Sequence, residues 1–304
     1  MISTISILSK LNMNMHSIRR IIITLWVIIS AVALCDARPL RVLAIGNSFS
    51  EDAVEQDLHI LATMGGHEII IGNLYYPACT LERHWNNLKK GVGEYSYRKI
   101  NVTGRVDTIP NCTMTRALHD EPWDIITFQQ GSAVSGVYSS YRFLPSLIKR
   151  VREIVGQRPR FLWHQTWAYA PGSTHQGFKK YSGDQMRMYA AILYCTKKVL
   201  ADNPELKGII PSGTAIQDAR TALGPDLTRD GHHLDMTIGR YIASCTWYGI
   251  LFSTTPALHT FLPAGMTVEE GEICRKASEE AIIHPFEIIS LKAFLEPEEE
   301  NQEP

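Results

Sequence analysis

Short apolar runs alternate along this chain with longer segments in which apolar residues recur every three or four positions. The short runs predict buried strands, which we expect at 42–45, 67–74, 124–128, 160–167 and 208–210. The longer segments predict helices at 53–64, 81–90, 113–120, 141–155, 185–201, 216–223, 237–252 and 268–283. Residues 91–111 are polar and rich in Gly and Thr, which indicates a hairpin or a surface excursion.

The alternation of strands and helices predicts an α/β domain, in which a parallel sheet is covered by helices on both faces. We place this domain at residues 38–255, where no linker or internal repeat divides the chain. Residues 256–304 are expected to form a C-terminal helical extension and an acidic tail, which we expect to be disordered beyond Glu296.

Residues 1–37 have the pattern of a secretory signal peptide. Basic residues precede an uncharged run at 21–34, which is short for a membrane span and is followed by small residues. We expect cleavage after Ala37 and an exported protein, periplasmic or secreted, with no membrane span after cleavage. Lipid attachment at Cys35 is an alternative, although Leu34 is bulkier than lipoprotein processing usually accepts.

The composition is that of an ordinary globular protein. The 304 residues are 45% hydrophobic and 20% charged, and a formal net charge of −1 gives no reason to expect a nucleic acid as partner. Of the six cysteines, five follow the leader, and their irregular spacing matches neither a zinc site nor a small disulfide scaffold. The sequence does not decide whether two of these cysteines form a disulfide. Because their number is odd, at least one thiol is unpaired within the chain.

Candidate chemistry begins after the first strand, in the sequence GNSFS at 46–50. A serine at a strand-to-helix turn is exposed at the carboxyl edge of a sheet, where free backbone N–H groups at the helix start stabilise an anion. Ser48 is therefore a candidate nucleophile. By itself the turn is better explained by a serine that caps a helix, so the assignment depends on partners elsewhere in the chain.

Polar residues follow the other predicted strands as well. They are the loop at Ala78, Gln129 with Gln130, His164, and Asp230 with His233. With Ser48 they offer a nucleophile, a base, an acid that orients the base, and amide donors, which are the parts of an acyl-transfer site. Each also has a structural explanation, as a satisfied loop pair, a core histidine or a turn residue. The adjacent histidines are weak evidence for a metal, and we expect neither a metal nor a cofactor.

Asp230 and His233 are separated by two residues in the turn DGHH, just before a predicted helix. Such a tight turn can bring the carboxylate back onto the imidazole. The pair then holds the ring in one tautomer and stabilises the imidazolium that forms when Ser48 gives up its proton.

These sequences resemble the SGNH (GDSL-type) hydrolase superfamily, whose signature is a Ser in a G-D-S turn and an Asp-x-x-His in the last block. The similarity extends from Arg41 to about Phe252. NLYYPACTLERHW, FQQGS, WHQTWAY and RDGHHLD are similar to an exported bacterial branch associated with polysaccharide breakdown, and the third block is similar to sialate and acetylxylan O-acetylesterases. The resemblance implies a three-layer α/β/α, flavodoxin-like fold and a serine hydrolase without a cofactor.

The resemblance also implies roles for single residues. Ser48 corresponds to the nucleophile, whose own N–H is one oxyanion donor, His233 to the general base, and Asp230 to the orienting acid.

Three positions depart from the family pattern. Ala78 stands where the family uses a Gly N–H in the oxyanion hole, and Asn47 stands where the signature has Asp. The third block lacks the family's Asn, so a Gln amide is the expected substitute, with Gln129 favoured over Gln130 by analogy.

The predicted function is that of a serine esterase that removes O-acetyl or similar short acyl groups from an oligo- or polysaccharide. We expect His164 and Trp167 to bind substrate. The further rings of Trp85, Trp163 and Tyr169 are expected to line a sugar cleft, because aromatic rings stack on pyranose faces. Core packing explains these aromatic residues equally well. One alternative is a carbohydrate-binding protein on a degenerate hydrolase fold, motivated by the departures above. Another is a lipase or thioesterase, disfavoured because no long apolar lid segment is visible.

Overall fold

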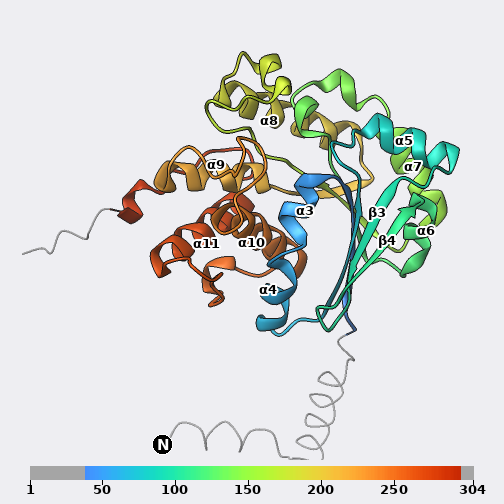
Figure 1. The fold of residues 1–304 in the computed structure, drawn as a ribbon, viewed down its shortest axis with the longest axis horizontal. Coiled ribbons are helices and arrows are strands. Elements are labelled where there is room, and N and C mark those ends of the chain that lie inside the picture. The colour runs from blue at the N-terminus through green and yellow to red at the C-terminus, as the bar shows by residue number, and fades with distance from the viewer. Residues whose placement is uncertain (1–37, 296–304) are drawn as a thin grey trace, which may run out of the picture. The chain divides into compact units, whose positions relative to one another are not determined.

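A seven-stranded sheet forms the centre of the computed structural model, which describes residues 38–295 (Figure 1). The strands are β1 (Leu40–Gly46), β2 (Ile69–Tyr75), β3 (Tyr95–Ile100), β4 (Val106–Cys112), β5 (Ile125–Phe128), β6 (Arg160–His164) and β7 (Leu206–Ile210). Their order is β4-β3-β2-β1-β5-β6-β7. The predicted signal peptide at 1–37 and the tail beyond Glu296 lie outside the described residues.

The expected α/β architecture is confirmed. β2, β1, β5, β6 and β7 run parallel, and numbered among themselves they have the flavodoxin-like order 2-1-3-4-5. The segment 91–111, expected as a hairpin or a surface excursion, supplies the antiparallel strands β3 and β4 at the β2 edge, so the sheet is mixed rather than wholly parallel. Chain connections leave β1 toward one edge and β5 toward the other, so the topological switch point lies between them.

Helices cover both faces of the sheet. They are α3 (Ser48–Val54), α4 (Leu58–Met64), α5 (Leu81–Lys90), α6 (Met114–Asp120), α7 (Leu144–Val155), α8 (Gln185–Asp202), α9 (Ser212–Leu223), α10 (Ile238–Phe252) and α11 (Val268–Ile283). Short 3₁₀ turns lie at Ser132–Val134, Tyr138–Tyr141, Gln176–Tyr181, Pro256–Leu258 and Lys292–Leu295. In Figure 1, α5, α6 and α7 lie on one face, and α3, α4, α9, α10 and α11 lie on the other.

Two apolar cores result, one on each face of the sheet. Successive side chains of a strand point to opposite faces, so Val42 and Ala44 of β1 join one core while Leu43 and Ile45 join the other. This explains why β1 reads as a continuous apolar run: both of its faces are buried. The helix expected at 53–64 is in fact two helices, and the first begins earlier, at Ser48.

The segment after residue 255 packs into the same compact unit as the rest of the described chain. α11 begins with a capping box formed by Thr267 and Glu270, and its buried face lies against α9 and α10 in one core. The chain beyond α11 is tied to α9, because the Ile289 N–H donates to Asp218 and the Leu291 N–H donates to Thr221. The helix expected in the C-terminal extension is thus present as α11 and packs against the rest of the described chain.

The five cysteines that follow the expected leader are all free and buried, so the disulfide left open by the sequence is not formed. Burial raises the pKa of their thiols, for Cys195 to about 11. Among helices in the described part of the chain, none is both long and apolar enough to cross a membrane.

Candidate active site

Ser48 is the first residue of α3, immediately after the turn that ends β1. Asn47 caps the helix, because its side-chain oxygen accepts the Phe49 N–H over 2.9 Å. Gly46 is needed for close packing, since a Cβ there would lie 2.4 Å from Ser50 Oγ. The turn buries Asn47 and Phe49 and leaves Ser48 partly exposed at the carboxyl edge of the sheet.

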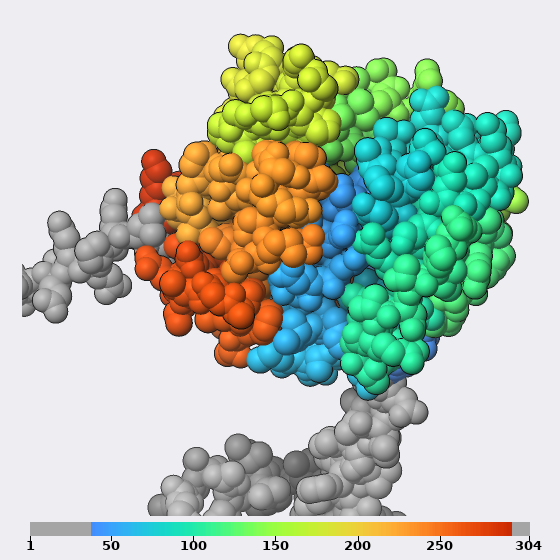
Figure 2. All heavy atoms as spheres, viewed as in Figure 1, coloured from blue at the N-terminus to red at the C-terminus, as the bar shows by residue number. Residues whose placement is uncertain are grey.

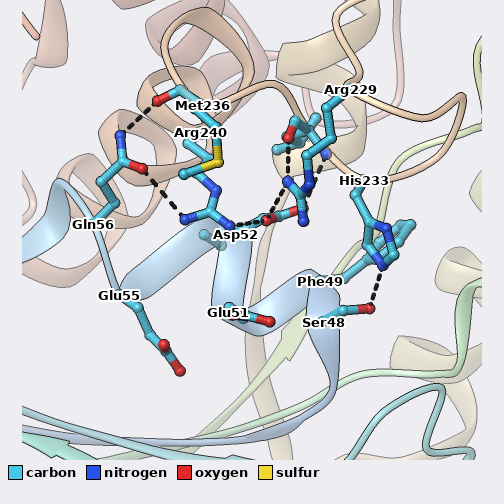
Figure 3. A network of polar contacts seen from close by, with 12 residues as sticks. Ser48, Phe49, Glu51, Asp52, Glu55, Gln56, Arg229, His233, Met236 and Arg240 are labelled. Carbon is cyan, nitrogen blue, oxygen red and sulfur yellow. Dashed lines mark hydrogen bonds and ion pairs between the residues drawn. The ribbon is translucent and has the colours of Figure 1, made fainter.

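His233 and Asp230 meet Ser48 across 182 or more positions of sequence. His233 Nε2 lies 2.8 Å from Ser48 Oγ, and His233 Nδ1 lies 2.6 Å from Asp230 Oδ2. An ionised carboxylate only accepts, so Nδ1 carries the ring proton, and Nε2 is left to accept the proton of the Ser48 hydroxyl. Figure 3 shows Ser48 on α3 with its oxygen directed at the His233 ring.

The Asp230 carboxylate is held by the turn in which it lies. Its Oδ1 accepts the N–H groups of His232 and His233, over 3.1 Å and 2.8 Å. Burial acts to raise the pKa of Asp230, but the hydrogen bonds from the His233 ring and from these two N–H groups outweigh it and lower the pKa to about 2. Asp230 is therefore ionised at neutral pH and can stabilise a protonated His233.

Two backbone N–H groups near Ser48 lack an acceptor in the described part of the chain: that of Ser48, in the first turn of α3, and that of Ala78, in the loop after β2. The Asn47 side chain donates to Cys79 O over 3.0 Å and so ties this loop to the Ser48 turn. Ala78 has φ +51, in the left-handed region that favours glycine. Ala78 therefore has a backbone conformation that is uncommon for a residue with a side chain.

A buried polar network fixes the orientation of Gln129. Because Asn47 Nδ2 donates to Cys79 O, Asn47 Oδ1 faces Gln129 and accepts from its Nε2 over 2.7 Å. Gln129 Oε1 then accepts from His164 Nδ1 over 2.8 Å. The second Nε2 hydrogen of Gln129 has no acceptor among the described residues, so it is available to an oxyanion.

Gln130 has no such hydrogen to offer. Its Nε2 donates to both the carbonyl and the hydroxyl of Ser140, and its Oε1 accepts the N–H groups of Leu81 and Gly131. The side chain holds loops together. Gln129 is 2% exposed and Gln130 1%, so the unused hydrogen, and not exposure, separates the two. Of the two glutamines left open by the sequence, the geometry favours Gln129.

The expectation that His164 and Trp167 contact substrate is wrong, because both side chains are completely buried. His164 Nε2 accepts from Ser212 Oγ over 3.1 Å, so both ring nitrogens are used, and burial lowers its pKa to about 3. Trp167 stacks on Phe49 with 4.1 Å between ring centroids and donates through Nε1 to His232 O over 2.8 Å. It supports the Ser48 turn and the His233 turn from inside.

The other three rings expected to stack on sugar differ in how far they are buried. Trp163 and Tyr169 are buried in the core, whereas Trp85 is half-buried against the core on the α5 side. Core packing, the alternative explanation, therefore accounts for most of these rings.

Figure 2 shows atoms of the blue segment around α3 exposed between the orange segment, near residues 230–250, and the cyan segment, near residues 75–90.

Comparison with known proteins gives a family for this architecture. The model of DUF4886, a domain of unknown function, matches residues 41–281. The chain belongs to the DUF4886 family. The crystal structure of a DUF4886 protein from Bacteroides uniformis ATCC 8492 is 43% identical, has a TM-score of 0.82, and is matched over 84% of this chain and 99% of that one.

More distant structures are similar to this DUF4886 chain at the level of the fold. An acetyl xylan esterase has 14% identity and a TM-score of 0.43, with 69% of this chain and 100% of that one covered. A putative arylesterase from Agrobacterium tumefaciens has 14% identity and a TM-score of 0.43, with coverage of 70% and 99%. Both likenesses are too remote to bear on function. No curated protein matches the chain.

One group of side chains in this DUF4886 chain has the spacing of metal ligands. The ligand atoms of Asp230, His232 and His233 lie within 4.8 Å of one another. Asp230 and His233 are already bonded to each other there, so an ion at this place would compete with the contact that orients His233 toward Ser48.

Two residues near the candidate active site, His175 and Asp52, were not predicted from the sequence. The His175 ring lies 4.7 Å from that of His232. Asp52 is buried one turn beyond Ser48. The signal for Asp52 was a carboxylate four residues after Ser48 in the same helix, which places the two side chains one turn apart.

Proposed function

We propose that the protein is a serine esterase that removes O-acetyl or similar short acyl groups from carbohydrate. The observation that carries the proposal is the continuous chain of hydrogen bonds from Ser48 through His233 to Asp230, with distances of 2.8 Å and 2.6 Å. A nucleophile, a base and a group that orients the base, at these distances and in this tautomer, are the requirements for acyl transfer. The assignment to the SGNH superfamily is part of this proposal.

In the first half-reaction, Ser48 Oγ attacks the ester carbonyl while its proton passes to His233 Nε2. The carbonyl carbon becomes tetrahedral, and its oxygen takes the negative charge. His233, now an imidazolium stabilised by Asp230, then donates its proton to the sugar oxygen as the bond from carbon to that oxygen breaks. The acyl group remains on Ser48, and the free sugar hydroxyl leaves.

The oxyanion is stabilised by donors that already exist in the structure. Within residues 38–295, the N–H groups of Ser48 and Ala78 have no acceptor, and one Nε2 hydrogen of Gln129 is not used. Fixed donors stabilise the transition state without reorganisation, and loss of one typically costs on the order of 100-fold in turnover. In the second half-reaction, water activated by His233 releases the acid by the same route.

The carbohydrate part of the proposal is supported by the sequence resemblance to O-acetylesterases, and the expected leader at 1–37 is consistent with an extracellular polymer as substrate. The complete hydrogen-bonded chain argues against a purely binding role, because such a role gives no reason to keep Ser48, His233 and Asp230 in register.

The experiment is a release assay on a panel of acetylated plant and host glycans, with nitrophenyl esters of increasing acyl length beside it. We expect acetate release from at least one glycan, a preference for short acyl chains, and labelling of Ser48 by a fluorophosphonate probe. Ser48→Ala is the control and should abolish all three. Preference for long acyl chains would favour a lipase or thioesterase, and glycan binding without labelling or release would overturn the esterase.

A further inference from the structure

Asp52 lies in α3 four residues after Ser48, at the spacing that places two side chains one turn apart on the same side of a helix. Its side chain is fully buried, with 0% exposure, and aspartates are almost never fully buried unless they are paired. Figure 3 shows Asp52 and Ser48 on the same helix, facing the segment that carries Arg229 and His233.

Two bonds to Asp52 come from the two ends of the turn that carries Asp230 and His233. Before the turn, Arg229 Nη1 donates to Asp52 Oδ1 over 2.9 Å. After it, the Leu234 N–H donates to Asp52 Oδ2 over 2.9 Å. Arg229 directly precedes Asp230 and Leu234 directly follows His233, so one carboxylate holds both ends of this turn.

The turn is also closed on itself. The Arg229 guanidinium donates to Leu234 O, and the Arg229 N–H donates to His233 O over 2.9 Å. Thr228 and Leu234 pair as an isolated β-bridge. Because the ends are joined in this way, the backbone on both sides of Asp230 and His233 is fixed to the same carboxylate.

Arg240 of α10 completes the environment of the carboxylate. Its Nη2 lies 2.7 Å from Asp52 Oδ1, and its Nη1 donates to Gln56 Oε1 over 3.3 Å. Gln56 in turn donates to Met236 O over 2.6 Å, so the chain after α3 also holds the segment that leads into α10 (Figure 3). Burial raises the pKa of Asp52 above its usual value, and Arg240 and Arg229 offset this only in part.

We propose that Asp52 is a positioning residue, which sets the distance between Ser48 and His233 by fastening the His233 turn to the helix that carries Ser48. The proposal rests on the esterase function above. It also explains why a charged cluster is kept in the interior: a buried ion pair adds little net stability compared with apolar packing, but its geometry is specific.

The test is Asp52→Asn in the full chain. The amide keeps the size of the side chain but turns one acceptor into a donor, which then faces the Leu234 N–H or the two guanidinium groups. We expect kcat on nitrophenyl acetate to fall roughly 10- to 100-fold with little change in KM, because a misplacement of about 1 Å costs on the order of 100-fold.

The matched control is Asp218→Asn, the same change at another fully buried carboxyl group. Asp218 lies on α9, accepts the Ile289 N–H over 2.8 Å, and has no role in the candidate active site. We expect the kcat of the Asp218→Asn variant to equal that of the wild-type protein. Equal losses in the two variants would overturn the proposal.

A double-mutant cycle separates positioning from a general loss of structure. If Asp52 acts through His233, Asp52→Asn has no further effect on the residual rate of a His233→Ala variant. A purely structural role predicts the same fold-loss in both backgrounds, and that result would contradict the proposal.

Hydrogen exchange gives a readout that does not depend on activity. Asp52→Asn should speed amide exchange in residues 228–235, whereas Asp218→Asn should speed it only near 285–291. If wild-type protein neither hydrolyses esters nor reacts with a fluorophosphonate, the esterase function fails even where exchange responds as expected. If wild type is active and Asp52→Asn changes neither kcat nor exchange at 228–235, the positioning role fails alone.

Discussion

The ends of β1 and β6 carry residues of reactive types at the same edge of the sheet, yet they differ in what those residues are free to do. Ser48, after β1, is partly exposed and is bonded through Oγ to a base. His164, at the end of β6, is completely buried, and both ring nitrogens have protein partners. Position at a sheet edge is therefore not enough for chemistry. A reactive side chain also needs exposure and hydrogen-bonding capacity that the protein has not used.

The largest expected difference is between the two histidines. His233→Ala should lower kcat on nitrophenyl acetate by about 10⁴-fold or more, because it removes the base, while its effect on stability is small for a half-buried side chain. His164→Ala should lower the free energy of unfolding by roughly 2–4 kcal/mol, because it leaves Gln129 Oε1 and Ser212 Oγ without partners and opens a cavity.

The two effects are separated by measuring kcat per folded molecule and urea unfolding for both variants. The reverse outcome, with a loss of turnover in folded His164→Ala as large as that in His233→Ala, would remove the distinction between the two strand ends.

The next effect concerns the two glutamines that follow β5. Gln129→Ala should cost on the order of 100-fold in kcat, because it removes an oxyanion donor. Gln130→Ala is the matched control: it breaks bonds to Ser140 and Leu81 and should lower stability without lowering kcat per folded molecule. Turnover that falls equally in both variants would show that neither glutamine is a specific donor.

A smaller effect follows from the neutral state of His164. Burial lowers its pKa to about 3, below the usual value of 6.5, so between these values the unfolded chain binds a proton that the folded protein does not. His164 therefore contributes stability that is present above pH 6.5 and is lost as pH falls toward 3, by about 1.4 kcal/mol per pH unit. Urea unfolding at pH 7, 6 and 5 should show a smaller loss of stability in His164→Gln, with the difference in slope growing as pH falls and approaching about 1.4 kcal/mol per pH unit below pH 6. An unchanged slope would mean that His164 is protonated in the folded state.

The smallest effect is at Ala78. Its φ of +51 costs a non-glycine residue on the order of 1 kcal/mol, so Ala78→Gly should raise the free energy of unfolding by up to about 1 kcal/mol and keep the N–H and the activity. The same change at Ala190, an exposed position inside α8, should lower it by roughly 0.5–1 kcal/mol. Destabilisation by Gly at both positions would contradict the strain at Ala78.

Much of the fold was predictable because burial leaves a period in the sequence. β1 reads as an apolar run because both of its faces are covered, whereas helices such as α5 and α7 read as amphipathic because each buries only one face. The hairpin at 91–111 could not be placed at the sheet edge, because strand neighbours are set by contacts between distant segments. The early start of α3 at Ser48 follows from the Asn47 cap, a local signal that apolar periodicity does not contain.

The contacts of the candidate site were predictable where they are local. Asp230 and His233 lie in one tight turn, so their spacing already implied contact. His164 and Trp167 were misassigned because exposure depends on what packs above a strand end, and Phe49 and Ser212 come from remote parts of the chain. Asp52 was missed for the same reason, since both of its arginine partners lie more than 170 positions away.

The central claim is that the partly exposed serine after β1 is a nucleophile. The most direct measurement is the rate of nitrophenyl acetate hydrolysis by purified wild-type protein and by Ser48→Ala, with urea unfolding of both. We expect Ser48→Ala to lose at least about 10⁴-fold in kcat and to unfold at the same urea concentration as wild type, because only the reacting hydroxyl is removed. A folded Ser48→Ala variant that hydrolyses the ester at the wild-type rate would contradict the account.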